Sequence, residues 1–529
     1  KEACRVLALF GKKVSRVTTT VGPEQEYFLI DKAMYEKRKD LVFCGRTLFG
    51  AKPPKGQELD DHYFGAIKPR VEAYMEDLNT ELWKLGILAK TEHNEVAPSQ
   101  HELAPIFSVA NIATDHNQLT MEIMQKVASR HSLVCLLAEK PFAGVNGSGK
   151  HNNWSLATDT GVNLFKPGET PYENAQFLLF LCAAVQAVDN YQDLLRLSVA
   201  TAGNDHRLGA NEAPPAVISI FLGDELTAVL DAIETDTPYS GTEKTVLKLG
   251  VHVLPKFTRD TTDRNRTSPF AFTGNKFEFR MVGSSDSIAC ANIMLNAAMA
   301  ETLKEFADRL EGVPDFESAL HDLIKETIKA HKRIIFNGNG YDDAWIKEAT
   351  EKRGLLNLRT TPDALATVLE KKNVEMLTSL KIFSEAEIRS RYEICLENYC
   401  KTVNIEGLTM VDMARKEILP AVEAYLGDLS GTVAAKTTAV PGLACKYEKD
   451  LISKLSKLAD EISDAASSLD TTLIRLKAIP DVTDAAYVIR DVVLQKMAEL
   501  RVVCDEAESI TADKYWPFPT YGDLLFGVR

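Results

Sequence analysis

The sequence lacks any CxxC pair: its nine cysteines lie at irregular positions, and their number is odd. Disulfide frameworks and zinc sites use paired cysteines at short spacings, so both are disfavoured. We interpret the cysteines as reduced thiols that pack as small apolar side chains. Because thiols stay reduced in the cytosol, we expect a cytoplasmic protein.

Long hydrophobic runs and an excess of positive charge are also missing. The longest apolar run, from Phe177 to Val185, is far shorter than the roughly 20 residues that span a bilayer. Acidic residues number 75 and basic residues 61, which gives a net charge of −14 that repels nucleic acid and anionic membranes. We therefore expect neither nucleic acid nor a membrane as partner.

The chain begins with Lys1 rather than methionine, and residues 1–17 have no secretory signal pattern. We expect it to begin inside a longer polypeptide. Its 529 residues, 45% hydrophobic and 26% charged, have the composition of a soluble globular protein. Its length alone suggests about three to four domains.

Two regions differ in pattern. From Gly22 to Gly283, short period-2 segments alternate with helical ones, and beyond Ser284 strand patterns almost vanish. In the second region apolar residues recur at steps of four and three, as on a coiled-coil face: Leu451, Leu455, Leu458, Ile462, Ala465, Leu469, Leu473 and Leu476. This face either packs inside its own subunit or contacts another one, and residues 484–504 are expected to fold back on it.

Two acidic pairs are candidate metal ligands. Glu24 and Glu26 are two residues apart in a β-prone segment, so both project from one face of a strand. Glu95 and Glu102 flank a Pro-Ser turn that can bring both carboxylates to one point. Hard oxygen ligands suit Mg²⁺ or Mn²⁺, although each pair taken alone could equally be a charged surface.

Residues 144–150 match the first seven positions of a phosphate-binding P-loop, but His151 stands where that motif needs Ser or Thr. The segment after it is typical of a strand, with His151, Asn153 and Ser155 on one face, rather than the helix a P-loop opens. We therefore interpret the glycines as a close approach of backbone to a ligand, with His151 as a possible metal ligand.

A third charged group lies on a predicted strand, where Lys276, Glu278 and Arg280 share one face and two phenylalanines face the core. Upstream, Arg207 precedes Glu212, and Arg264 and Arg266 form a short fork. Arginine forks suit carboxylate and phosphate oxygens, although each could form a surface ion pair instead.

Taken in chain order, these six motifs resemble glutamine synthetase: the Glu24/Glu26 pair, the Glu95/Glu102 turn, the glycine loop before His151, Arg207 with Glu212, the Arg264/Arg266 fork and the strand with Glu278. The segments GPEQEYFL, TEHNEVAPSQHELAPIF, KPFAGVNGSGKHNNWS and GNDHRLGANEAPPA are similar to its type III branch. The resemblance implies an α+β fold: a catalytic domain over residues 1–330, with a curved antiparallel sheet flanked by helices. It also implies a mainly helical region over residues 331–529, with a heptad-like hairpin at about 446–510. The family's N-terminal β-domain has no counterpart in these residues.

The resemblance also implies site roles. One divalent ion, Mg²⁺ or Mn²⁺, would be held by Glu26, Glu95 and Glu102, and another by Glu24, His151 and Glu278. Glutamate would be bound by Arg207, Arg280, Asn146 and Gly147, with His151 and Glu212 nearby. ATP would contact Phe107, Ser155, Arg264, Arg266 and Lys276. Catalysis would depend on Glu212, which deprotonates ammonium, and on Arg207 and Arg266.

The implied function is ATP-dependent ligation of ammonia to glutamate through a γ-glutamyl phosphate, in a homo-oligomer of two stacked hexameric rings, a dodecamer. Three alternatives remain: a ligase that uses another amine, a non-catalytic assembly relative, and a guanidino kinase. Two positions depart from the better-known branches, which have arginine where this chain has Ala271 and Lys276. These departures predict rearranged phosphate contacts.

Overall fold

The computed structural model describes the whole chain except residues 210, 212, 240–245, 248–256, 259–266 and 529. In the described part, the strands end at residue 283 and helices make up the regular structure that follows. The predicted change of pattern near Ser284 is therefore the point where the sheet ends.

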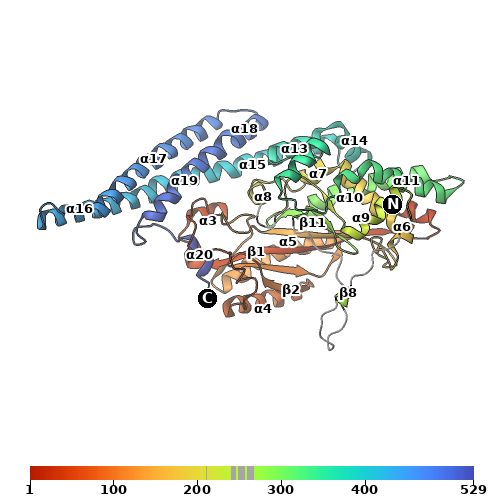
Figure 1. The fold of residues 1–529 in the computed structure, drawn as a ribbon, viewed down its shortest axis with the longest axis horizontal. Helices are drawn as coiled ribbons and strands as arrows, with labels where there is room; N and C mark the ends of the chain where they lie inside the picture. Colours follow the sequence, from red (N-terminus) through yellow and green to blue (C-terminus); the bar gives the residue numbers. More distant parts are fainter. Residues whose placement is uncertain (210, 212, 240–245, 248–256, 259–266, 529) are drawn as a thin grey trace.

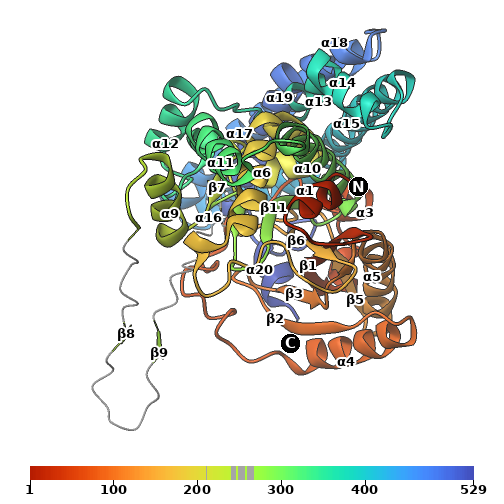
Figure 2. The same ribbon diagram turned by 90° about the vertical axis from the view of Figure 1, so that its right-hand side faces the viewer.

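One nine-stranded sheet forms the centre of the first region (Figures 1 and 2). Its strands are β1 (Val17–Asp31), β2 (Ala89–Asn94), β3 (Gln100–Pro105), β4 (Ser108–Val109), β5 (Leu133–Leu136), β6 (Gly149–Thr158), β7 (Ile220–Phe221), β10 (Phe270–Phe272) and β11 (Phe277–Gly283). The order is β2-β3-β1-β6-β11-β10-β7, with β4 and β5 also pairing with β1. The neighbours are antiparallel except β7 and β10, which run parallel, and the predicted α+β class is confirmed. A separate pair joins β8 (Val246–Leu247) and β9 (Phe257–Thr258).

The long strand β1 organises the sheet because it pairs with four other strands. Its register places Glu24 opposite His151 of β6 and Glu26 opposite Glu102 of β3. Between them, the side chain of Gln25 is fully buried, as the alternation of a strand requires. The acidic residues of neighbouring strands are thereby brought to one place.

Helices cover the sheet. Among them, α4 (Pro69–Lys84) and α5 (Ala110–Arg130) bury Tyr74, Leu78 and Met124 against Tyr27 and Leu29 of β1. The others of this region are α1 (Glu2–Leu9), α2 (Lys32–Tyr35), α3 (Lys39–Cys44), α6 (Ala175–Asn190), α7 (Gln192–Leu197), α8 (Ala202–Arg207), α9 (Asp224–Glu234), α10 (Ile288–Leu310) and α11 (Phe316–His331). Helix α6 is nearly all apolar and buried, and it packs against α10 and α11.

The remaining helices follow α11. They are α12 (Asp343–Lys347), α13 (Thr361–Ala366), α14 (Lys371–Ser379), α15 (Glu385–Met413), α16 (Leu419–Ala439), α17 (Lys446–Leu476), α18 (Val482–Val488) and α19 (Leu494–Ile510). Of these, α15 to α19 extend away from the sheet at the upper left of Figure 1. Helix α17 carries the apolar stripe and contacts α15, α16 and α19. Of the eight stripe residues, all but Leu451 and Ala465 are buried, and these two pack partly buried against the core. Division into domains near residue 330 stays a prediction.

The last helix, α20 (Tyr521–Phe526), returns to the sheet. Its Leu524 and Leu525 bury against Phe28 and Ile30 of β1, and the Tyr521 hydroxyl lies 2.7 Å from the Thr47 hydroxyl. Helix α20 therefore lies beside the strands rather than at the end of the helical extension (Figure 1).

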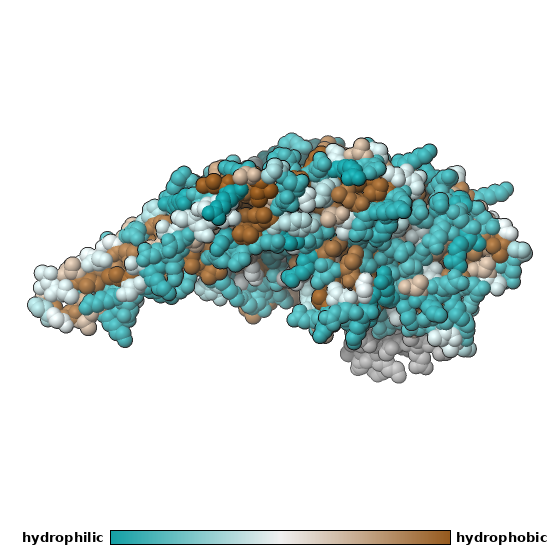
Figure 3. Space-filling view, turned by 90° about the horizontal axis from the view of Figure 1, so that it is seen from above, coloured by the Kyte–Doolittle hydropathy of each residue, from teal (hydrophilic) through white to brown (hydrophobic). Residues whose placement is uncertain are grey.

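The described surface is mainly hydrophilic on the face seen in Figure 3, with apolar side chains gathered over the helical part. Among the described helices, none combines the length and apolar character needed to cross a membrane. All nine cysteines are free thiols in the structure.

Candidate active site

The first candidate metal-ligating group joins three adjacent strands. His151 of β6 places its Nδ1 3.2 Å from Glu24 of β1 and 3.1 Å from Glu278 of β11. The amide of Asn153 donates to the other oxygen of Glu24 at 3.0 Å and fixes that carboxylate. The structure thus brings together the three residues that the resemblance assigned to one cation, with ligand atoms within 4.8 Å of one another.

Two further groups continue from this one. Glu26, Glu102 and His151 form the second, and His93, Glu95 and Glu102 form the third. The His151 Nε2 lies 3.8 Å from Glu26, whose other oxygen accepts the backbone N–H of Gly149 at 2.6 Å. Glu102 belongs to both groups, so Glu26, Glu95 and Glu102 lie in one acidic basin. The His151 basin is our name for the residues of all three groups: Glu24, Glu26, His93, Glu95, Glu102, His151 and Glu278.

The turn between Glu95 and Glu102 brings these two residues close. The Glu95 N–H donates to the Gln100 carbonyl at 2.9 Å, and Ser99 adopts a φ of 63° between them. His93 was given no role from the sequence, yet its Nε2 lies 3.0 Å from Glu102 and its Nδ1 3.7 Å from Glu95. Period-2 alternation in this extended segment, which places His93 and Glu95 on one face, was the signal that could have found it.

The electrostatics of the His151 basin favour a positive charge. Burial disfavours the imidazolium, but hydrogen bonds to Glu24 and Glu278 outweigh it and hold the pKa of His151 well above its usual range. Burial likewise opposes ionisation of Glu24 and Glu278, yet His151 keeps their pKa values low. The hydrogen bond to Glu102 raises the pKa of His93 to about 9. Clustered carboxylates with one imidazole form a donor set that fits a hard divalent cation.

The two arginines expected at the substrate are both buried but bonded differently. Arg207 of α8 directs Nη2 to the Arg280 carbonyl at 3.1 Å and Nη1 to the Val282 carbonyl at 3.3 Å. A β-bulge between Phe279 and Val282 interrupts the pairing of β11 with β6 beside these carbonyls, and Arg207 satisfies them. Arg280 itself forms an ion pair with Glu278 at 3.1 Å.

The Asn146–Gly147 turn lies beside the His151 basin and is tightly held. Gln57 accepts the N–H of Asn146 and donates to its side-chain oxygen, both at 2.8 Å. A Cβ on Gly147 would lie 2.4 Å from the Glu139 carbonyl, so only glycine fits this approach.

The predicted ATP residues that the structure describes are spread along the sheet. Ser155 donates to the Asn275 carbonyl at 2.9 Å, which places it beside Lys276. Phe107 lies between β3 and β4, is 67% exposed, and contacts the backbone at Gly22. The exposed ring is free to stack on a planar ligand. The remaining predicted residues, Glu212, Arg264 and Arg266, lie outside the described residues.

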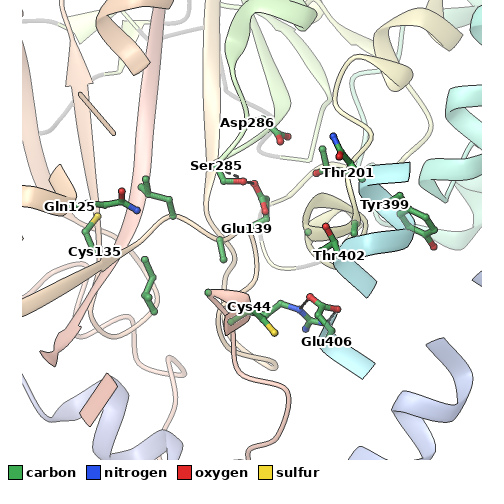
Figure 4. A pocket seen from close by; sticks show the side chains of 18 of the residues that line it. Cys44, Gln125, Cys135, Glu139, Thr201, Ser285, Asp286, Tyr399, Thr402 and Glu406 are labelled. Atoms are coloured by element: carbon green, nitrogen blue, oxygen red, sulfur yellow. Dashed lines mark hydrogen bonds and ion pairs between the residues drawn. The ribbon is translucent and has the colours of Figure 1, made fainter. Parts of the chain in front are cut away.

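Two cavities differ in their relation to this site. A small one of about 10 Å³ is lined by residues of the His151 basin and its surroundings: Glu26, Glu95, Gln100, Asn146, Gly147, His151, Arg207, Asn211 and Ala213. A larger one of about 670 Å³ lies between the sheet and α15, and Figure 4 shows Glu139 bonded to Ser285 on its wall, with Cys44 and Glu406 below. The larger cavity contains none of the predicted site residues, so the chemistry is assigned to the His151 basin.

Comparison with known proteins gives the family. A family model described as glutamine synthetase, catalytic domain, matches residues 3–218, and one described as glutamine synthetase C-terminal domain matches residues 319–437. A glutamine synthetase of Butyrivibrio fibrisolvens is 50% identical to this chain and is matched over 100% of this chain and 75% of its own length. The chain belongs to the glutamine synthetase family.

Two other relatives agree with this family. A Type-3 glutamine synthetase of Dictyostelium discoideum is 45% identical over 98% of this chain and 71% of its own length. A glutamine synthetase of Bacteroides fragilis (strain YCH46) is 46% identical, covering 99% and 74%. The resemblance to the type III branch is confirmed. Membership of the glutamine synthetase family makes the chain a glutamate–ammonia ligase, with glutamate, ammonia and ATP as substrates and divalent metal as the family's cofactor.

Proposed function

We propose that the His151 basin is where this chain forms glutamine from glutamate, ammonia and ATP. The observation that supports this most is the convergence of Glu24, His151 and Glu278 from three adjacent strands, with ligand atoms within 4.8 Å. Two carboxylates this close repel each other, and burying charged groups costs desolvation free energy. A bound cation would offset both costs.

The basin is proposed to hold two divalent cations, Mg²⁺ or Mn²⁺, because its donors are mostly carboxylate oxygens. Glu24, His151 and Glu278 would hold one, and Glu26, Glu95 and Glu102 the other. When bound, such cations neutralise phosphate and carboxylate charge during in-line phosphoryl transfer. The hydrogen bond from Asn153 orients the Glu24 carboxylate before a cation binds, and the hydrogen bond from the Gly149 N–H orients the Glu26 carboxylate.

The substrates are proposed to lie on either side of the basin. Glutamate would be bound by Arg207, Arg280 and the Asn146–Gly147 turn, with His151 and Glu212 nearby. The nucleotide would extend along the sheet towards Phe107, Ser155, Arg264, Arg266 and Lys276. Arginine neutralises the carboxylate and phosphate charges that would otherwise keep the two substrates apart.

The reaction needs two services from the chain's own residues. The γ-carboxylate attacks the terminal phosphorus of ATP and gives an acyl phosphate, with ADP as leaving group. Ammonium must then lose a proton before its nitrogen attacks the acyl carbon and releases phosphate. We propose that Glu212 accepts that proton and that the segment from Arg207 to Pro214 excludes water.

The test replaces one proposed metal-ligating glutamate at a time and compares the activity of each variant with that of a variant at a distant glutamate. Glu278→Ala and Glu24→Ala should each lower ATP- and ammonium-dependent glutamine formation about a hundredfold or more, because loss even of a residue that only orients a ligand costs 10- to 100-fold. Glu122→Ala on the exposed face of α5, where Glu122 is 59% exposed, is the matched control and should keep full activity. Normal glutamine formation by Glu278→Ala, in a protein that folds as the wild type, would overturn the site assignment.

Assembly and location are proposed at the same level. We expect a homo-oligomer of two stacked hexameric rings, located in the cytoplasm and divided near residue 330 into a catalytic and a helical part. Native mass spectrometry should give a mass that is a multiple of six chains of 58.5 kDa. A monomer at micromolar concentration would contradict the ring assembly.

A further inference from the structure

We propose that Gln100 is a specificity-determining residue, whose side-chain oxygen accepts a hydrogen bond from the α-ammonium group of bound glutamate. The proposal rests on the proposed function of the His151 basin. Gln100 precedes Glu102 by two residues on β3, so both side chains project from the same face of that strand. Only 1% of Gln100 is exposed.

The amide nitrogen of Gln100 is already committed. Its Nε2 donates to the Gly147 carbonyl at 2.9 Å and to the Ser148 hydroxyl at 3.1 Å. A carbonyl can only accept, so the nitrogen must face Gly147, and this fixes which way the amide points. The oxygen is therefore left on the other side.

That oxygen is buried and has no hydrogen-bond partner among the described residues. An acceptor buried without a donor is costly, and native structures rarely retain one without a reason. Gln100 lines the small cavity of about 10 Å³ together with the carboxylates of Glu26 and Glu95. An acceptor beside two acidic residues favours a positively charged donor.

A second unpartnered atom lines the same cavity. The Nε of Arg207 is a buried donor without a hydrogen-bond acceptor in the described part of the structure. An α-amino acid carries an ammonium group and a carboxylate on one carbon, so it offers a donor to Gln100 and an acceptor to Arg207. A cavity of this size holds about one water-sized group, which fits the ammonium group alone and leaves the rest of the glutamate outside it.

The matched control for this proposal is Gln57. It holds the neighbouring Asn146 by hydrogen bonds from both ends of its amide, and it does not line the small cavity. Gln57→Met therefore removes support from the turn alone. Gln100→Met removes the same support for Gly147 and also the oxygen that faces the cavity.

The experiment compares L-glutamate with glutarate, which has both carboxylates but no α-ammonium group. KM for L-glutamate and the inhibition constant of glutarate against it are measured for each variant, with Mg²⁺, ATP and ammonium present. Gln100→Met should raise KM for L-glutamate about ten- to hundredfold more than it raises the glutarate constant, the size expected for one hydrogen bond to a charged group, while the lost support of the turn affects both ligands alike. Gln57→Met should change both constants by the same factor.

Two outcomes would overturn the assignment. Equal changes for both ligands in Gln100→Met would mean that the residue only holds the turn, and no change would mean that the cavity takes water alone. Thermal unfolding of both variants checks that they fold. Calorimetric binding of the two ligands with Mg²⁺ and ADP reads the same contrast without turnover. A wild type that binds both ligands but forms no glutamine would therefore refute the proposed function and still decide the role of Gln100.

Discussion

At the scale of single residues, Gly149 is where the His151 basin tolerates least change. A Cβ there would lie 2.0 Å from Nη2 of Arg207 and 2.3 Å from its Cζ. The N–H of Gly149 also donates to Glu26. One added methyl group would therefore disturb a proposed substrate arginine and a proposed metal ligand together.

We predict that Gly149→Ala loses most glutamine-forming activity and destabilises the fold by about 1–3 kcal/mol, as overpacking of a well-packed site does. Activity and thermal unfolding are measured on the same preparation. Gly427→Ala is the control, because a Cβ at that position in α16 meets nothing within 4 Å and alanine favours helix. Full activity in Gly149→Ala would mean that Arg207 moves aside without consequence.

The sequence predicted which of the proposed metal ligands share a strand face better than it predicted their hydrogen-bond partners. Period-2 alternation was enough to place Glu24 with Glu26, and Glu278 on the charged face of its strand, because side-chain direction in a strand is a local property. Roles for His93 and Gln100 were not predicted. The role of His93 depends on the turn between β2 and β3, which brings His93 to Glu102. The role of Gln100 depends on the approach of Gly147 to its side chain.

At the scale of elements, α19 carries a buried acid against the segment that follows α3. Glu508 is 9% exposed, and its carboxylate accepts the N–H of Ala51 at 3.0 Å. Burial raises the pKa of Glu508 to about 7, although Ala51 and Arg38 lower it in part and Asp505 raises it further. Arg501 also faces this group and lowers its pKa.

The sign of the pH effect follows from this shift. The folded pKa lies above the unfolded value of about 4.3, so between these values the folded state binds more protons. The free energy of unfolding therefore falls as pH rises from about 4 to 7, and the full penalty remains above pH 7. Glu508→Gln should remove it and be more stable than the wild type at pH 8, by up to about 3 kcal/mol, and equally stable near pH 4.

The measurement is thermal unfolding across this pH range. Glu506→Gln is the control on the same helix, since the Glu506 side chain is 47% exposed and pairs with Lys454 at the surface. It should leave the pH profile of the wild type unchanged. A stabilisation by Glu508→Gln that is the same at pH 4 and pH 8 would show that packing, rather than proton binding, is responsible.

The strands and helices themselves were only partly predictable. The sheet region and the helical region were separated correctly near Ser284, because their hydrophobic periods differ. The hydrophobic pattern did not predict the strand order or the parallel pair β7–β10, because pairing between distant segments depends on tertiary packing. The strand at Gly149–Thr158 excludes the P-loop interpretation, which requires a helix after Lys150.

At the scale of the whole molecule, the C-terminal segment closes the chain on itself. The hydroxyl of Tyr521 accepts hydrogen bonds from the Ala143 N–H and from Arg501 of α19, each at 3.0 Å, and contacts Thr47. One atom therefore connects the helical extension, the segment before Asn146 and the loop after α3. The heptad stripe did not predict this return, because the contacts are made by a six-residue helix far from it in sequence.

Tyr521→Phe keeps the ring, which is 2% exposed, and removes only this acceptor. Two part-buried donors, the Ala143 N–H and Arg501, would each lose one acceptor, so we expect a loss of about 0.5–1.5 kcal/mol of unfolding free energy and faster proteolysis of the C-terminal segment. Tyr172→Phe removes the same atom from a ring that is 38% exposed and should change neither measurement. If Tyr521→Phe has the unfolding free energy and the proteolysis rate of the wild type, the contacts that remain are sufficient to hold the C-terminal segment. They include Leu524 and Leu525 against β1 and the hydrogen bond from Ser99 to the Leu525 carbonyl.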